Sequence, residues 1–199
     1  MTVEQEAALI ARAKTGDLEA FAQLYDRHRS AIYRAARLIT GDNATAEEIL
    51  QETFLRAFKN VEKFREDVSP APWLYRVAVN LAYDSMTSRR RWMAAISNIV
   101  DWLVTPVLES PEQQVETYEL QELVREAIGR LDLKQRTVLV LYYLQELSLT
   151  EIADIVECPV GTVKSRLHYA RENLRRELLA DKRIPGGLPH EFIQLAFPR

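Results

Sequence analysis

The chain of 199 residues has 29 acidic and 26 basic residues and is 47% hydrophobic, a composition that excludes a disordered protein and indicates a globular one. Its single cysteine, Cys158, excludes an internal disulfide framework and suits a reducing compartment. The sequence starts without the apolar core of a signal peptide, and no apolar run reaches the ~18 residues of a membrane span, so we expect a cytoplasmic protein without membrane insertion.

Helical periodicity extends through almost the whole chain. Apolar residues recur at helical spacing, and no alternating strand pattern or hairpin turn is present. The sequence therefore predicts an all-α fold of two small helical domains joined by a linker. The expected boundaries are 1–91 for the first domain, 92–116 for the linker, 117–180 for the second domain and 181–199 for an irregular tail. The linker opens with an apolar stretch, 92–107, whose role the sequence does not indicate.

Two segments at the start of the first domain have a helical pattern with one apolar face. Along 18–40, the expected core residues are Phe21, Leu24, Tyr25, Ile32 and Ala36. Along 44–58, the expected inward-facing residues are Ile49, Leu50, Thr53, Ala57 and Phe58. The outward face then carries residues at i, i+3, i+4 and i+7, namely Glu48, Gln51, Glu52 and Leu55. A solvated helix surface is one explanation of this face.

The next segment, PWLYRVAVNLAYDSMTSRRRW at 72–92, combines aromatic side chains with arginines. These residues are Trp73, Tyr75, Arg76, Tyr83, Arg89, Arg90 and Arg91. Unpaired bases stack on aromatic rings and arginines bind phosphates, so the pattern is typical of a surface for single-stranded nucleic acid. The alternative is that Trp73 packs in the hydrophobic core, which is the more common position for a tryptophan.

The second domain contains two predicted helices separated by a tight turn. The shorter one, SLTEIADIV, spans 148–156, and the ECP that follows ends it because the residue before a proline avoids helical backbone angles. On the longer helix one stripe holds the apolar residues Val160, Val163, Leu167, Ala170, Leu174 and Leu178. This combination predicts a helix-turn-helix motif.

The outer face of the longer helix is basic, although the chain as a whole has a net charge of −3. Small residues at its start, Gly161 and Thr162, allow close approach to a duplex, and the first amide groups can bind phosphates. The groups expected on DNA are Lys164, Ser165 and His168 for base edges and Arg171, Arg175 and Arg176 for phosphates. A solvated charged face is the alternative.

The second domain resembles a known family. The strings AIGRLDLKQRTVLVLYYLQELS and LTEIADIVECPVGTVKSRLHYARENLRREL are similar to region 4 of bacterial extracytoplasmic-function (ECF) sigma factors of the sigma-70 family. The resemblance implies that the second helix recognises the minus-thirty-five promoter element through Thr162, Lys164, Ser165, Arg166, His168, Tyr169 and Arg171. The chain departs from the family pattern at Tyr169, where arginine is common, and at Glu146, where glycine is common.

The first domain resembles region 2 of the same family. ATAEEILQETFLRAF is similar to region 2.2, which implies that Glu48, Gln51, Glu52 and Leu55 dock on the clamp helices of the largest RNA polymerase subunit. The segment 72–92 is similar to regions 2.3 and 2.4, which melt and read the minus-ten element. The implied contacts are Trp73, Arg76, Asn80, Tyr83, Asp84, Arg89 and Arg90, with Asn80 beneath a flipped base. The chain departs from the pattern at SPAPWL, where the family commonly has PFRAWL.

We therefore interpret the chain as a sigma factor that binds core RNA polymerase, recognises both promoter elements and promotes DNA melting. The resemblance also implies an anti-sigma factor as a partner. A self-sufficient helix-turn-helix regulator that binds operator duplex is the alternative. An enzyme is not expected, since the chain has neither a P-loop nor zinc-ligand spacing, and we expect no catalytic residue, metal or cofactor.

Overall fold

The structure is a computed structural model that describes residues 3–96 and 115–181, with the side chains of residues 4–88 and 123–181. Of the apolar stretch 92–107 in the predicted linker, residues 92–96 are helical and the rest lies outside these ranges, as does the tail beyond Asp181. Within them the chain forms helices and no strand, which confirms the predicted all-α fold. None of the described helices is both long enough and apolar enough to cross a membrane.

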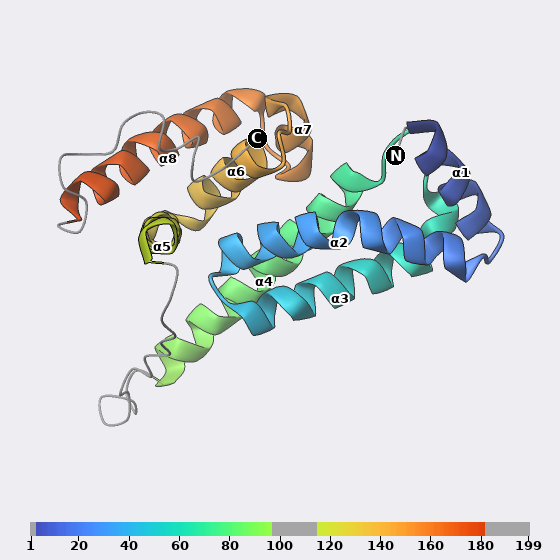
Figure 1. The fold of residues 1–199 in the computed structure, drawn as a ribbon. Helices are drawn as coiled ribbons and strands as arrows, with labels where there is room; N and C mark the ends of the chain where they lie inside the picture. Colours follow the sequence, from blue (N-terminus) through green and yellow to red (C-terminus); the bar gives the residue numbers. More distant parts are fainter. Residues whose placement is uncertain (1–2, 97–114, 182–199) are drawn as a thin grey trace.

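Eight α-helices and one short 3-10 turn follow one another in the described part of the chain (Figure 1). The first domain contains α1 (Val3–Lys14), α2 (Leu18–Thr40), α3 (Asn43–Lys59), the 3-10 turn η1 (Val61–Lys63) and α4 (Ala71–Ile96). The second domain contains α5 (Val115–Arg130), α6 (Leu133–Leu144), α7 (Leu149–Ile155) and α8 (Val160–Ala180).

Residues in the turns fix where the helices begin and end. Gly41 ends α2 in the left-handed conformation, at a φ of 78°, which glycine adopts without strain. The next residue, Asp42, begins α3 by accepting a 2.8 Å hydrogen bond from the amide of Thr45. At the start of α7, Ser148 and Glu151 form a capping box: the side chain of each accepts a hydrogen bond from the backbone amide of the other. The helix-turn-helix therefore has a well-defined first helix although α7 is short.

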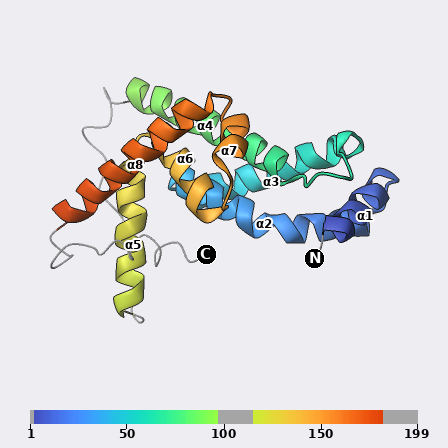
Figure 2. The same cartoon turned by 90° about the horizontal axis from the view of Figure 1, so that it is seen from above.

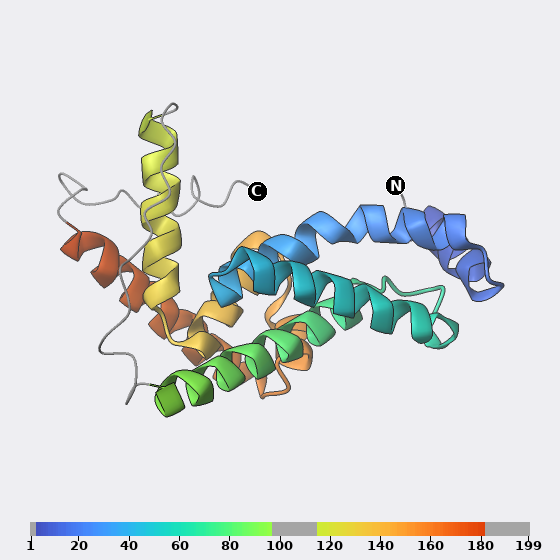
Figure 3. The same cartoon turned by 90° about the horizontal axis from the view of Figure 1, so that it is seen from below.

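In the first domain, α2, α3 and α4 lie side by side and enclose a buried core (Figure 3). α1 packs on the N-terminal part of α2, where Leu9 and Ile10 are buried against Leu24. A buried carboxylate also joins these two helices, because Glu6 Oε1 lies 2.7 Å from Nε2 of His28 and accepts a 3.0 Å hydrogen bond from Arg27. Burial lowers the pKa of His28, and the carboxylate of Glu6 acts in the opposite direction.

One predicted core residue lies elsewhere. Phe58 was expected inside the first domain, but its side chain is 46% exposed, and Phe54 is buried instead, at 6%. The ring of Phe54 packs edge-on against Tyr25 at 4.7 Å. Phe58 lies one helical turn later, near the end of α3, where its ring packs edge-on against that of Phe21 at 5.1 Å. The prediction was wrong because the buried stripe of α3 continues through Ala57, which is 1% exposed, and leaves Phe58 at its edge.

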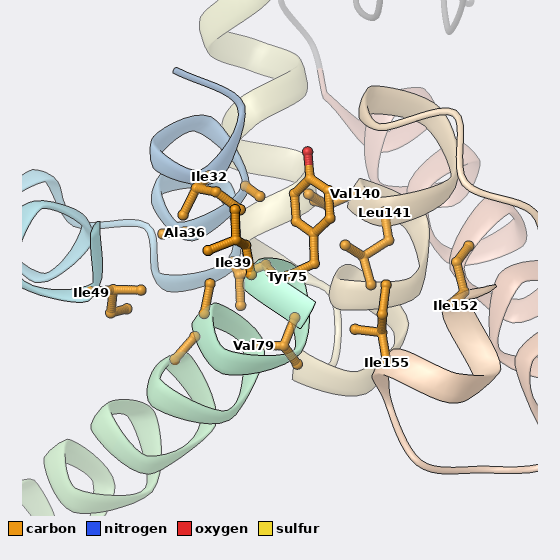
Figure 4. Close-up of a cluster of buried hydrophobic side chains, with 14 of the residues drawn as sticks. Ile32, Ala36, Ile39, Ile49, Tyr75, Val79, Val140, Leu141, Ile152 and Ile155 are labelled. Carbon is orange, nitrogen blue, oxygen red and sulfur yellow. The ribbon is translucent and has the colours of Figure 1, made fainter. Parts of the chain in front are cut away.

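The two domains share one continuous hydrophobic core, which the sequence did not predict. α6 packs against α2, and α7 packs against α4 (Figure 2). Tyr75 of α4 lies between Ile32 and Ile39 of α2 on one side and Val140 and Leu141 of α6 on the other (Figure 4). All five side chains are buried. The apolar face of each domain is therefore completed by the other.

Polar groups are paired across the same boundary. The Tyr75 hydroxyl donates a hydrogen bond to Gln145 Oε1, and Gln145 Nε2 donates to the carbonyl of Ala31 at 3.4 Å. Burial raises the pKa of the Tyr75 phenol well above its usual value. Arg136 of α6 reaches the carbonyl of Ile39, near the end of α2, at 2.7 Å. These bonds satisfy buried polar groups that would otherwise oppose the packing of the two domains.

Candidate nucleic-acid interface

The longer helix of the helix-turn-helix, α8, has one buried face and one exposed basic face. Five of the six residues predicted for the apolar stripe are buried, namely Val163, Leu167, Ala170, Leu174 and Leu178, and Val160 is half-buried. Of the residues expected on duplex DNA, Lys164, Ser165, His168, Tyr169 and Arg171 are exposed, and Thr162 and Arg166 are half-buried. The stripe thus holds the helix on α6 and α7 while most of the expected DNA contacts face outward.

The turn between α7 and α8 is closed by backbone hydrogen bonds. The amide of Cys158 donates to the carbonyl of Ala153 at 3.1 Å, and that of Thr162 donates to Pro159 at 2.8 Å. Pro159 is the N-cap residue of α8, where its missing amide removes no helical hydrogen bond. This turn presents the first turn of α8 at the surface, where Gly161 is exposed.

Arg166 differs from its neighbours on α8. Its guanidinium lies 3.5 Å from the sulfur of Cys158, and its charge lowers the pKa of the Tyr83 phenol in the first domain, against the larger rise caused by burial. In this arrangement Arg166 therefore lies toward the boundary between the domains and away from the exposed basic face.

Arg171 is held by two aromatic rings that sequence analysis missed. Its Nε donates a 2.8 Å hydrogen bond to the hydroxyl of Tyr143, at the end of α6. Its guanidinium carbon lies 5.4 Å from the ring centre of Tyr143 and 5.5 Å from that of Tyr142. The YY dipeptide at 142–143 is visible in the sequence, but only the packing of α6 on α8 brings it to Arg171.

The expected surface for single-stranded DNA lies on α4 and is divided between two environments. Asn80 and Asp84 are exposed and lie four residues apart, so they share one helix face. Trp73 is half-buried, with its ring edge-on to Phe64 at 5.1 Å. The side chains of Arg89 and Arg90 lie outside the described residues.

Arg76 and Tyr83, also expected on the minus-ten strand, lie toward the second domain. Arg76 donates a hydrogen bond to the carbonyl of Asp154, near the end of α7. Tyr83 is half-buried, its hydroxyl is fully buried, and burial raises the pKa of its phenol. The second domain thus covers part of the surface that the sequence assigns to promoter DNA.

Three of the four residues predicted for the outward face of α3 are exposed. Glu48, Gln51 and Leu55 are exposed, and Leu55 is among the few large apolar side chains in the described ranges with this property. Glu52 is half-buried and accepts a 2.7 Å hydrogen bond from Arg56 one turn later. The face combines two acidic groups, an amide and an apolar side chain along one side of a helix, which suits a protein partner better than a nucleic acid.

Similarity to known proteins identifies the family of the chain. Models of sigma-70 region 2 and sigma-70 region 4 match residues 24–92 and 121–174. The ECF RNA polymerase sigma factor SigW of Bacillus subtilis is 38% identical over 181 residues, which cover 85% of this chain and 94% of SigW. The chain belongs to the ECF family of RNA polymerase sigma factors. The RNA polymerase sigma-H factor of Pseudomonas aeruginosa is 32% identical over 187 residues, 89% of this chain and 96% of that protein.

Two solved structures have the same fold. CnrH, in its complex with the cytosolic domain of CnrY, has a TM-score of 0.66 at 26% identity and matches 89% of this chain and 99% of CnrH. The sigma factor RpoE of Bartonella quintana, in complex with the anti-sigma factor NepR, has a TM-score of 0.65 at 25% identity and matches 81% of this chain and 98% of RpoE. The family assignment made from the sequence motifs is therefore confirmed.

The family regions coincide with the surfaces described above. In this sigma factor, α3 and nearly all of α4 fall within the region 2 match, and α7 and most of α8 fall within the region 4 match. α1 precedes the region 2 match. Glu48, Gln51 and Leu55 of α3, Asn80 and Asp84 of α4, and Lys164, His168 and Arg171 of α8 therefore all lie within the two matched regions.

Proposed function

We propose that this sigma factor binds core RNA polymerase through the outward face of α3, recognises the minus-thirty-five element with α8 and opens DNA at the minus-ten element with α4. One observation carries the proposal: the chain presents an exposed basic helix of a helix-turn-helix and, on separate helices, an exposed Asn80/Asp84 face and the exposed side chains of Glu48, Gln51 and Leu55 on α3. A duplex-binding regulator needs only the first of these. The chemistry of RNA synthesis then belongs to the polymerase.

Promoter binding requires the two domains to separate. The two elements, by their names, lie about 25 base pairs apart, or roughly 85 Å along B-DNA at about 3.4 Å per base pair. In the structure α8 belongs to a domain that shares a core with α4, and Arg76 donates to Asp154 across the boundary. Residues 97–114 can span about 60 Å when fully extended, so the chain between the domains is long enough for most of this separation.

An anti-sigma factor is the partner that we propose for the closed arrangement. A supporting observation is that RpoE of Bartonella quintana, which this chain matches over both domains, was solved in complex with the anti-sigma factor NepR. A protein that holds the domains together would keep Arg76 and Tyr83 covered and so oppose promoter binding.

Transcription with purified components tests the proposed function. Core polymerase supplemented with this protein should produce transcripts that start at defined promoters, whereas core polymerase alone should not. If the protein instead binds duplex DNA tightly without core polymerase and directs no transcript from any of many genomic promoters, the regulator hypothesis is correct and the sigma-factor mechanism is not.

The docking face of α3 gives a direct prediction. Replacing both Gln51 and Leu55 with alanine should weaken binding to core polymerase roughly tenfold, because a buried apolar anchor and its neighbouring amide would be lost from the interface. Affinity can be measured by titrating labelled protein with core polymerase, and circular dichroism shows whether the helices are intact.

A matched control removes the same two side-chain types elsewhere. Gln23 of α2 and Leu179 of α8 are both exposed and lie off the α3 face. The Gln23→Ala, Leu179→Ala variant should bind core polymerase as the wild type does. Equal affinities of the two double variants would contradict docking through α3.

A further inference from the structure

Arg171 is held more firmly than the other exposed cations of α8. Its Nε donates to Tyr143 Oη at 2.8 Å, and its guanidinium lies against the rings of Tyr142 and Tyr143. These two rings meet edge-to-face at 5.1 Å and 84°, so each fixes the orientation of the other. The Tyr143 side chain is anchored in turn, because it packs against both large buried clusters. The acceptor that orients Arg171 is therefore part of the rigid second domain.

The rest of the guanidinium remains available. Within the described residues, Arg171 forms no ion pair, and its two terminal amino groups donate no hydrogen bond to protein. Arg176, by contrast, donates through a terminal amino group to Asn173 on the same helix. A guanidinium held through Nε presents its two terminal amino groups as a fork, which matches two oxygens of one phosphate.

The position of Arg171 also suits a phosphate. It is exposed and lies one and two turns after His168 and Lys164 on the same flank of α8. The charge of this arginine is not neutralised by any carboxylate in the described part of the chain. An arginine loses rotamer freedom when it binds a phosphate, and prior fixation by Tyr143 removes much of that loss.

We propose that Tyr143 is a positioning residue of the DNA interface: its hydroxyl holds Arg171 so that the guanidinium fork meets one backbone phosphate of the duplex bound by α8. The inference rests on the proposed binding of duplex DNA by α8. It extends that interface from α8 to the end of α6 through the hydrogen bond between Arg171 and Tyr143. Tyr143 thereby links the packing of the second domain to its affinity for DNA.

The test compares single-atom changes in the holoenzyme, assembled from core polymerase and this protein, on a promoter duplex identified by transcription with the wild type. Tyr143→Phe keeps the ring and removes the acceptor of the hydrogen bond. It should weaken promoter binding about threefold to tenfold, the range expected for a lost hydrogen bond to a charged group that is partly replaced by water. Tyr142→Phe, which also keeps the ring beside Arg171, should cause a smaller loss.

Salt dependence and a double variant show whether the effect passes through Arg171. Arg171→Ala should weaken binding roughly tenfold and reduce the slope of log affinity against log salt by about 0.9, the value for one phosphate contact. Tyr143→Phe should reduce the slope in the same direction. In the Arg171→Ala background, Tyr143→Phe should have no further effect, because the group that it positions is absent.

The outcomes separate this inference from the proposed function. If Arg171→Ala weakens binding but Tyr143→Phe does not, or weakens it equally with and without Arg171, the positioning role is wrong while DNA binding by α8 stands. If Tyr143→Phe lowers only the melting temperature and leaves the salt slope unchanged, the hydrogen bond between Tyr143 and Arg171 stabilises the packing of α6 on α8 and has no role in DNA binding. If Arg171→Ala itself has no effect, both the phosphate contact of α8 and the role of Tyr143 are wrong.

Discussion

Replacing Asn80 with alanine is expected to reduce open-complex formation on duplex promoters by about tenfold to a hundredfold. An unpaired base must be held by stacking and by hydrogen bonds to its edge, and the side chain of Asn80 offers both a donor and an acceptor. It is exposed on α4, one turn from Asp84, so a base can reach it. A pair of such hydrogen bonds contributes about 1–3 kcal/mol. The permanganate reactivity of unpaired thymines measures the open complex directly.

A promoter already unpaired across the minus-ten element provides the control for Asn80. On this template no free energy is needed to unpair the bases, so the Asn80→Ala holoenzyme should form open complexes at a level much closer to that of the wild type. Equal opening of duplex promoters by the variant and the wild type would show that Asn80 is a solvent-exposed amide without a role in melting. An equal deficit on both templates would place the defect in another step, such as binding to the polymerase.

Replacing Arg136 with alanine is expected to lower the free energy of unfolding by about 3 kcal/mol. Arg136 is 7% exposed, and its guanidinium donates to the carbonyl of Ile39 at 2.7 Å, to that of Leu131 at 3.1 Å and to that of Gly129. Ile39 is near the end of α2, and Gly129 is near the end of α5, so the cation lies at the negative ends of two helix dipoles.

Alanine at position 136 would leave these carbonyls buried without donors and would open a cavity between the domains. Burial lowers the pKa of Arg136, yet an arginine remains protonated at neutral pH, so the charge is present in the folded state. Urea denaturation followed by circular dichroism gives the free energy of unfolding. The loss should be larger than that of a typical surface substitution because the same side chain joins α2, α5 and α6.

Arg130 supplies the matched control for Arg136. It lies on the exposed side of α5, and its ion pairs with Glu126 and Glu177 are long, at 3.8 Å and 3.6 Å. Arg130→Ala should therefore change the free energy of unfolding by less than about 0.5 kcal/mol. If Arg136→Ala is as stable as Arg130→Ala, the buried arginine does not hold the two domains together.

Because Arg136 spans the two domains, its removal has a functional consequence as well. The Arg136→Ala variant should expose Arg76 and Tyr83 more often, since the contacts that cover them depend on the same packing. Stability and access to the proposed minus-ten surface are thus coupled through one side chain.

The sequence by itself determined the helices and the identity of the three candidate faces. Helical periodicity and turn residues such as Gly41 and Ser148 depend on neighbours a few positions away, which is information that a sequence contains. The buried stripe of α8 and its exposed basic flank follow from the same local geometry. The motifs of regions 2 and 4 could likewise be recognised in the sequence, because the residues of each motif are close together along single helices.

Only the tertiary structure decided which of those residues are available and how they are supported. Phe58 has the same local pattern as a core residue but is 46% exposed, because packing with other helices decides which positions at the edge of an apolar face are covered. Arg76 and Arg136 meet partners 78 and 97 residues away in sequence, and Arg171 meets one 28 residues away. Periodicity shows which side of a helix is apolar, whereas the packing of helices distant in the sequence decides what each side contacts.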